Sequence, residues 1–224
     1  MIENHNFRNL CKEILTLTYG FSDFNGTLHE DNMKSLMDSV GIINKSIDYR
    51  ETKQLLLNSL RDNTSGIDIS IMGFENGTYI HQPYGTHAAP DFILFINDTY
   101  LMIELKSSKS DGIVWNTHTP RKNWIYLFSC EKLKDTTYFM GQNMVSDEFR
   151  QTIDHINFEI EQLRMKTKLK CDSEDNKHGF TDYIRPMKMQ VNGIGGGETR
   201  FIKSPYRKEY ERCVSTFIKN IFRK

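Results

Sequence analysis

The sequence has no long apolar run, few prolines and no paired cysteine motif. Its apolar stretches fall far short of the roughly 20 residues that a membrane-spanning helix needs, and residues 1–10 contain no apolar core of the secretory type. Cys11, Cys130, Cys171 and Cys213 show no CxxC spacing. Free thiols of a cytoplasmic protein are therefore expected, rather than a disulfide framework or a zinc site.

A net charge is also absent, because 29 Lys and Arg balance 29 Asp and Glu. The charges are nevertheless unevenly distributed. Residues 1–100 hold 7 basic and 13 acidic side chains, whereas residues 161–224 hold 15 basic and 8 acidic ones. A basic C-terminal third favours an anionic partner such as nucleic acid, although ordinary solvated surfaces would give the same pattern.

Hydrophobic spacing in the first hundred residues indicates helices first and strands after them. A first helix is expected over residues 5–19. A second is expected after Thr27, with Met33, Leu36, Met37 and Val40 on one face. A third is expected after Asp48, where Glu51 completes a capping box. Strands are expected over residues 67–72 and 78–81, with Asn76-Gly77 as the turn between them.

The second half of the chain alternates between strand and helix patterns. Strands are expected over 124–128, over 137–140 and, at an edge of the sheet, over 183–191. A long helix is expected from the Ser146 cap to about Leu169, and a final helix from Ser204-Pro205 to Phe222. The apolar residues on one face of the long helix are Phe149, Ile153, Ile156, Ile160 and Leu163. The whole predicts an α/β fold with a mixed central β-sheet and α-helices on both faces.

One domain is expected for residues 1–224, because the length suits a single core. Within it, residues 1–66 form an N-terminal helical part, residues 67–169 a core that carries the chemistry, and residues 170–224 a basic C-terminal part.

The stretch 89–109 is the one around which the chain is organised. Two apolar runs, 92–96 and 100–105, are separated by Asn97-Asp98-Thr99, which are turn formers. This pattern predicts a tight β-hairpin. The loop that follows the hairpin is polar and interrupted by glycine and proline, so we expect it to be an ordered loop.

Three ionisable residues border the predicted hairpin. Asp91 precedes the first strand, while Glu104 and Lys106 share one face of the second strand and Leu105 points the other way. Mg²⁺ takes oxygen ligands from one or two carboxylates and supports phosphodiester hydrolysis. Asp91 and Glu104 suit this role, with the main-chain carbonyl of Leu105 as a third oxygen, and Lys106 is placed to orient or deprotonate the attacking water. A surface salt bridge between Lys106 and Glu104 is the plainer alternative.

Pro90-Asp91, twelve intervening residues and Glu104-Leu105-Lys106 resemble the signature of the PD-(D/E)xK nuclease superfamily. Over about residues 82–165 the chain most resembles type II restriction endonucleases. The resemblance implies a restriction-endonuclease-like fold and Mg²⁺-dependent, sequence-specific cleavage of double-stranded DNA that leaves 5′-phosphate ends. It makes Asp91 and Glu104 the metal ligands and Lys106 the catalytic lysine. Some members add an acid from a preceding helix, for which Glu51 is the only candidate, although its role in the capping box explains it better.

The partners implied are double-stranded DNA, a second copy of the chain in a homodimer and, as a family expectation, a cognate methyltransferase. A twofold dimer suits a palindromic site, since one active site cuts one strand. The basic residues proposed to contact DNA are Lys109, Arg121, Lys122, Lys188, Arg200 and Lys203.

Two other functions remain open. A repair or junction-resolving nuclease of the same fold would recognise DNA structure rather than sequence. A non-catalytic DNA-binding protein would retain the fold without cleavage, although the presence of all three site residues argues against it.

Overall fold

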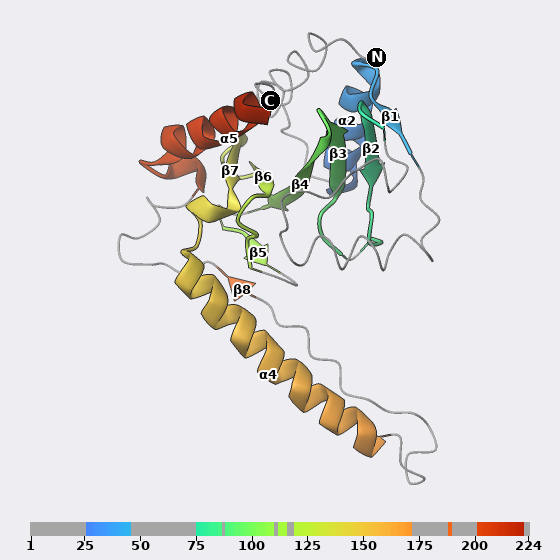
Figure 1. The fold of residues 1–224 in the computed structure, drawn as a ribbon. Helices are drawn as coiled ribbons and strands as arrows, with labels where there is room; N and C mark the ends of the chain where they lie inside the picture. The colour runs from blue at the N-terminus through green and yellow to red at the C-terminus, as the bar shows by residue number, and fades with distance from the viewer. Residues whose placement is uncertain are drawn as a thin grey trace.

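The computed structural model describes residues 26–45, 75–86, 88–109, 112–115, 119–171, 188–189 and 201–221. Its centre is a six-stranded sheet in the order β1-β2-β3-β4-β6-β7 (Figure 1). The strands are β1 (Ile43–Asn44), β2 (Thr78–His81), β3 (Phe92–Ile96), β4 (Thr99–Ser108), β6 (Ile125–Cys130) and β7 (Asp135–Met140). β1 and β2 are parallel, as are β4 and β6, and the other neighbours are antiparallel. The mixed sheet and the α/β class predicted from the sequence are confirmed.

The hairpin predicted around Asn97 is confirmed as β3 and β4. The two strands pair from Phe92 with Ile103 to Ile96 with Thr99. Asn97 and Asp98 form the turn with φ values of 45° and 54°, as a two-residue type I′ turn requires, and Asn and Asp tolerate this conformation best among residues other than glycine. The Asn97 amide also donates to the carbonyl of Ile221, 3.2 Å away, which ties the turn to the end of the last helix.

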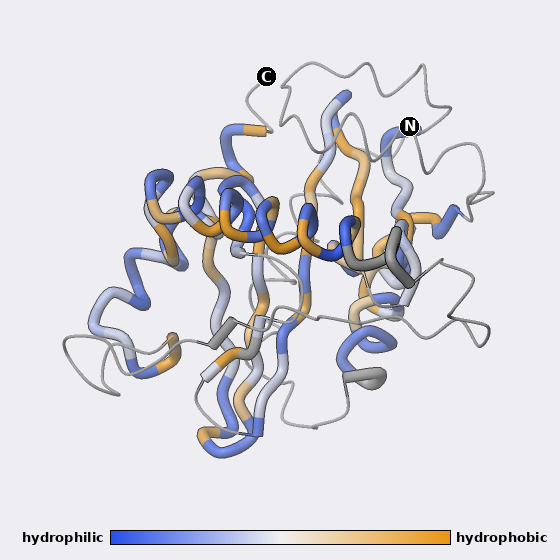
Figure 2. The backbone as a smooth tube through the Cα atoms, turned by 90° about the horizontal axis from the view of Figure 1, so that it is seen from below, coloured by the Kyte–Doolittle hydropathy of each residue, from blue (hydrophilic) through white to orange (hydrophobic). Residues whose placement is uncertain are grey.

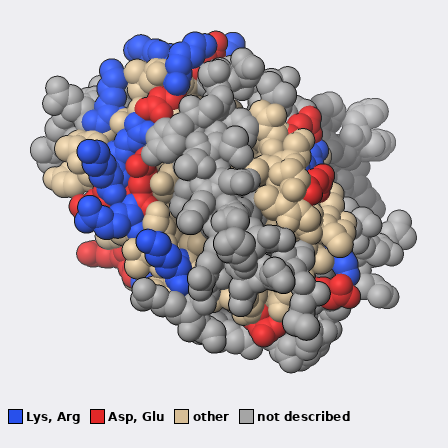
Figure 3. Space-filling view, turned by 90° about the horizontal axis from the view of Figure 1, so that it is seen from above, with Lys and Arg blue, Asp and Glu red and all other residues tan. Residues whose placement is uncertain are grey.

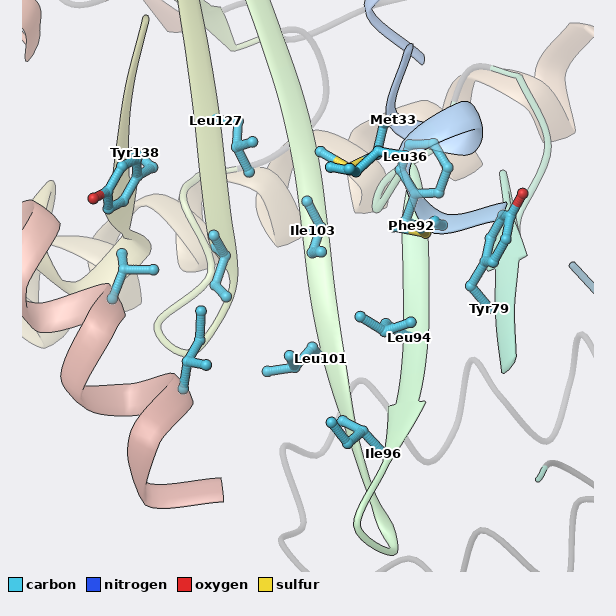
Figure 4. Packing of buried hydrophobic residues seen from close by; sticks show 14 of the residues in the cluster. Met33, Leu36, Tyr79, Phe92, Leu94, Ile96, Leu101, Ile103, Leu127 and Tyr138 are labelled. Atoms are coloured by element: carbon cyan, nitrogen blue, oxygen red, sulfur yellow. The ribbon is translucent and has the colours of Figure 1, made fainter. Parts of the chain in front are cut away.

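Two helices pack on one face of the sheet. They are α2 (Gly26–Ser39) and α5 (Arg207–Ile221). Met33 and Leu36 of α2 meet Phe92 in the core of this face (Figure 4), and α5 adds Val214 and Ile218. Helix α2 follows the amphipathic pattern predicted from the sequence. Helix α5 begins at Arg207, shortly after the predicted start at Ser204-Pro205, and the Ser204 hydroxyl accepts from the Tyr206 amide just before it.

The opposite face has an aromatic core. Its buried members include Tyr126, Phe128 and Phe139 from β6 and β7, joined by Trp115 and Phe201. Trp115 belongs to β5 (Val114–Trp115), which pairs with β8 (Lys188–Met189), and Phe201 begins the 3-10 helix η5 (Phe201–Lys203). The stretch expected to be only an ordered loop thus contains a short strand.

The long helix α4 (Asp147–Cys171) follows the 3-10 helix η3 (Gly141–Asn143). As predicted, Ser146 caps it, accepting from the Phe149 amide at 3.1 Å. The buried guanidinium of Arg150 anchors the first turn by donating to the carbonyls of Pro120 and Val145, at 2.9 and 3.2 Å. From there α4 extends away from the sheet (Figure 1).

Several predicted elements lie outside the described residues: the helices over 5–19 and after Asp48, the strand over 67–72, and most of the edge strand over 183–191. In the part that the structure describes, no helix is long and apolar enough to cross a membrane. Of the cysteines whose side chains are described, Cys130 is buried and Cys213 is half-buried.

Gly141 is expected to be intolerant of any side chain. An added Cβ would overlap the carbonyl oxygen of Arg121, and this segment is held by the bond from the Gly141 amide to the Trp124 carbonyl, 3.1 Å. We expect Gly141→Ala to lower the free energy of unfolding in urea by about 1–3 kcal/mol. Gln142→Ala, which changes an exposed neighbour, is the control. Equal stability of the two variants would contradict the close approach.

Candidate active site

The hairpin register brings Asp91 to Glu104. Phe92 pairs with Ile103, so the next position on each strand sets Asp91 opposite Glu104. The Asp91 amide donates to Glu104 Oε2 at 3.2 Å, and the Leu105 amide donates to Asp91 Oδ2 at 2.7 Å. On the other side, the Asp91 carbonyl accepts from the Gln82 amide at 2.7 Å. Asp91 is therefore fixed between β2 and β4.

Glu104 and Lys106 project from the same face of β4, toward the aromatic core. Lys106 Nζ lies 2.6 Å from Glu104 Oε1 and 5.8 Å from the centre of the Trp115 ring. The salt bridge considered from the sequence is thus formed, but it is not a surface pair, since the two side chains are only 17% and 6% exposed. A buried pair of this kind carries a desolvation cost that its own attraction offsets only in part.

Burial keeps both carboxyls from ionising easily. The pKa of Asp91 is raised to about 8, mainly because the group is withdrawn from water and next because Glu104 repels its charge. Burial also raises the pKa of Glu104, against the opposing effect of Lys106. Two acids here share one nearby cation, so the site favours a bound proton or an additional positive charge.

Glu30 of α2 is a third acid near this pair. Its negative charge raises the pKa of Asp91 and of Glu104. Glu30 Oε2 is held by His81 Nε2 at 2.8 Å and by the Gln82 side-chain amide at 3.0 Å. Helix α2 therefore adds negative potential to the site from beyond the hairpin.

Glu30 is not among the site residues predicted from the sequence. Glu51, the candidate for an acid on a preceding helix, lies outside the described residues. A signal for Glu30 was present, because it precedes Met33 and Met37 by three and seven residues and so shares the buried face of its helix. An acid in line with an apolar stripe is unusual and needs a partner.

The residues proposed to contact DNA are placed less uniformly. Lys109 is exposed just beyond β4, and Lys203 is exposed at the end of η5. The Arg121 amide donates to the Tyr126 hydroxyl, and Lys122 pairs with Asp147 at 2.7 Å on the surface. For Lys188 only the backbone is described, and Arg200 lies outside the described residues.

Seen from above, Lys and Arg side chains gather over α5 (Figure 3). Lys208, Arg212 and Lys219 are the exposed basic residues of that helix. Because α5 packs on the face of the sheet opposite to Glu104 and Lys106, this part of the basic C-terminal third does not line the candidate site.

The donor set suits a hard cation that retains water. Within the described ranges, no three His, Cys, Asp or Glu side chains lie close enough together to form a metal-binding group. Asp91 and Glu104 thus supply two carboxylates, and Mg²⁺ is characteristically bound by one or two carboxylates together with several waters. Withdrawal from water raises the pKa of both carboxyls, so a bound cation would help to keep them ionised. The residues present therefore fit Mg²⁺.

Comparison of the chain with protein-family profiles, with curated proteins and with solved structures finds no match in any of the three. The inference about function therefore depends on the geometry of the site and on the sequence pattern that predicts it.

The raised pKa of Asp91 gives a pH dependence of stability. Between about pH 4 and pH 8 the folded protein binds a proton that the unfolded chain has released, so without metal its stability should fall as pH rises through this range. Asp91→Asn keeps the shape and stays neutral. We expect its melting temperature to exceed that of the wild type by several degrees at pH 8 in EDTA, corresponding to about 1–2 kcal/mol, and by little at pH 5.

Glu148→Gln is the matched control for this measurement, because Glu148 is an exposed acid on the first turn of α4. Its melting curves should follow those of the wild type at both pH values. Wild-type and Asp91→Asn proteins with the same pH dependence would refute the assignment of Asp91 as a buried, protonated carboxyl.

Proposed function

We propose that this protein is a Mg²⁺-dependent nuclease that hydrolyses phosphodiester bonds in double-stranded DNA, with Asp91, Glu104 and Lys106 as its catalytic residues. The observation that carries the proposal is that the buried Glu104 and the half-buried Asp91 and Lys106 meet at one end of a hairpin, with the pKa of both acids raised. A structural salt bridge needs one acid. A second carboxylate in the same buried place raises the cost of folding and is best explained by a cation that it helps to bind.

Each residue has a separate role in the proposed reaction. Asp91 and Glu104, with the main-chain carbonyl of Leu105, would hold Mg²⁺. The cation, when bound, neutralises phosphate charge and lowers the pKa of a coordinated water. Lys106, held beside Glu104 at 2.6 Å, would orient the attacking water or, as the neutral amine, take its proton. The Lys106 ammonium group lies over the Trp115 ring, 5.8 Å from its centre, within the range of a cation–π interaction.

The finer proposal is a type II restriction endonuclease with a restriction-endonuclease-like fold. It is supported by the spacing of Pro90-Asp91 and Glu104-Leu105-Lys106, and by the position of these acids on adjacent strands of a mixed sheet. This assignment also proposes cleavage within a specific sequence, 5′-phosphate ends and a cognate methyltransferase in the same system. Lys109 directly follows β4, the strand that carries Lys106, and its side chain is exposed. Among the described basic residues, we propose it as the contact to the phosphates near the cut.

Digestion of supercoiled plasmid with Mg²⁺ tests the proposal. Discrete fragments are expected, with none in EDTA. Cutting confined to branched or damaged DNA would instead identify a repair or junction-resolving nuclease. Binding without cutting of any substrate would identify a DNA-binding protein.

Three alanine variants separate chemistry from binding. Asp91→Ala should abolish cleavage while DNA binding remains measurable. Lys106→Ala should lower the single-turnover rate by about 10²–10⁴-fold with little loss of affinity, whereas Lys109→Ala should weaken binding and leave that rate nearly unchanged. An equal loss of rate and affinity in Lys106→Ala would make Lys106 a phosphate contact rather than a catalytic group.

Glu30 is expected to tune the site through its charge. Glu30→Gln preserves the side-chain shape beside His81 and Gln82 but removes a charge that raises the pKa of Asp91 and Glu104. The acidic limb of the pH–rate profile should therefore move to lower pH, with the plateau rate retained. Complete loss of cleavage at every pH would show that Glu30 is itself a metal ligand.

A further inference from the structure

The long helix α4 carries an apolar stripe with the spacing of a coiled-coil seam. Phe149, Ile153, Ile156, Ile160 and Leu163 follow one another at alternating intervals of four and three residues. This is the repeat of the a and d positions of a heptad, with isoleucine at both a positions, and it is the pattern that packs against another helix.

Three of the five side chains of the stripe are exposed, and those of Ile153 and Ile160 are half-buried. Phe149, Ile156 and Leu163 are 53%, 46% and 60% exposed, although such side chains are normally buried. Hydrophobic residues recur along α4 between hydrophilic ones (Figure 2), and the helix extends away from the sheet (Figure 1). The fold thus presents a contiguous apolar surface of the type that marks an interaction site.

We propose that α4 is a dimerisation helix that pairs in parallel with α4 of a second copy of this chain. The inference goes beyond the proposed nuclease activity and does not depend on it, because no residue of the stripe belongs to the candidate active site. In a parallel pair each apolar residue packs against its own counterpart, so all five positions of the stripe are covered at once.

Charge complementarity identifies the occupant as the same helix. With the stripe at a and d, Glu159 takes a g position and Arg164 the following e position. In a parallel pair these are the positions that meet across the seam, so Glu159 would face Arg164 of the partner subunit on both sides of the pair. Thr152 and Asn157 occupy the preceding g and e positions and are polar. Arg164 is paired at 2.7 Å with Glu161 of its own helix, and exposed pairs of this kind exchange at little cost.

The antiparallel arrangement is less favourable for the same charges. An antiparallel pair that aligns Ile156 with Ile160 of the partner subunit joins g to g and e to e. Glu159 would then face its own copy, whereas Arg150 does not reach the seam, because its guanidinium is buried against the carbonyls of Pro120 and Val145. Like charges across a helix pair select against that pairing.

Sedimentation velocity of the full-length protein over a range of concentrations tests the proposal. The wild type is expected to dimerise at micromolar concentration, and Ile156→Glu to raise the dissociation constant by at least about tenfold. The control is Phe158→Glu, which places the same charge at another exposed apolar residue of α4. Phe158, which is 58% exposed, lies on the side of α4 opposite to the stripe, and its variant should dimerise like the wild type.

A wild type that stays monomeric at about 100 µM, a concentration at which even weak specific pairs associate, would overturn the proposal. Equal weakening by Phe158→Glu and Ile156→Glu would overturn it as well, because the stripe would then have no special role. Far-ultraviolet circular dichroism of each variant establishes that the fold is retained.

Charge reversal tests the orientation. Arg164→Glu should weaken the parallel dimer, since it places two acids across the seam, and Glu159→Arg combined with Arg164→Glu should restore it. In the antiparallel pair Arg164 would face no acid across the seam, so Arg164→Glu would leave the dimer as tight as the wild type. An Arg164→Glu dimer that is as tight as the wild type, or no restoration in the double variant, would refute the parallel arrangement.

Discussion

The register of the β3–β4 hairpin is the constraint on which the candidate site depends. Asn97 and Asp98 close the hairpin in a two-residue turn, and each strand then contributes five paired positions before the chain reaches Asp91 and Glu104. The twelve residues that separate the two acids in the sequence are therefore those of one closed hairpin. A one-residue slip would turn Glu104 and Lys106 to the opposite face, so the turn positions the acids as firmly as any contact between them.

Burial makes this position costly and also useful. β3 is buried at every residue, and Glu104 is 4% exposed beside it. The strands around the acids stabilise the fold through apolar packing, which allows two carboxyls to remain in a place where their charges are poorly solvated. The fold thus tolerates a local penalty at the site, as expected where a function rather than stability determines the residues.

Elements with strong local signals were predictable from the sequence. The hairpin, β6, β7, α4 with its Ser146 cap, and α2 and α5 all follow from periodicity and turn chemistry. The placement of β1 beside β2 required the tertiary structure, because a long segment of the chain separates these two strands and leaves no local pattern. The same holds for the contacts of Glu30, whose carboxylate reaches His81 and Gln82 from a distant helix. Trp115 is close to Lys106 in sequence, but the loop-like pattern around it does not predict that its ring lies beside the Lys106 ammonium group.

The candidate site and the α4 stripe are both incomplete in a single chain. Burial makes Asp91 and Glu104 hard to ionise without a bound cation, and three apolar side chains of the α4 stripe are exposed to water. The two requirements are connected by the direction of α4, which starts next to the sheet and runs away from it. A parallel helix pair would hold two sheets at the same end of the dimer, whereas an antiparallel pair would hold them at opposite ends of a 25-residue helix, roughly 37 Å long.

Only the parallel pair would bring two of the proposed nuclease sites together on one short duplex segment, and twofold symmetry would then match the symmetry of a palindromic site. The heptad charges of α4 and the double-strand cleavage proposed for the hairpin thus favour the same arrangement on independent grounds.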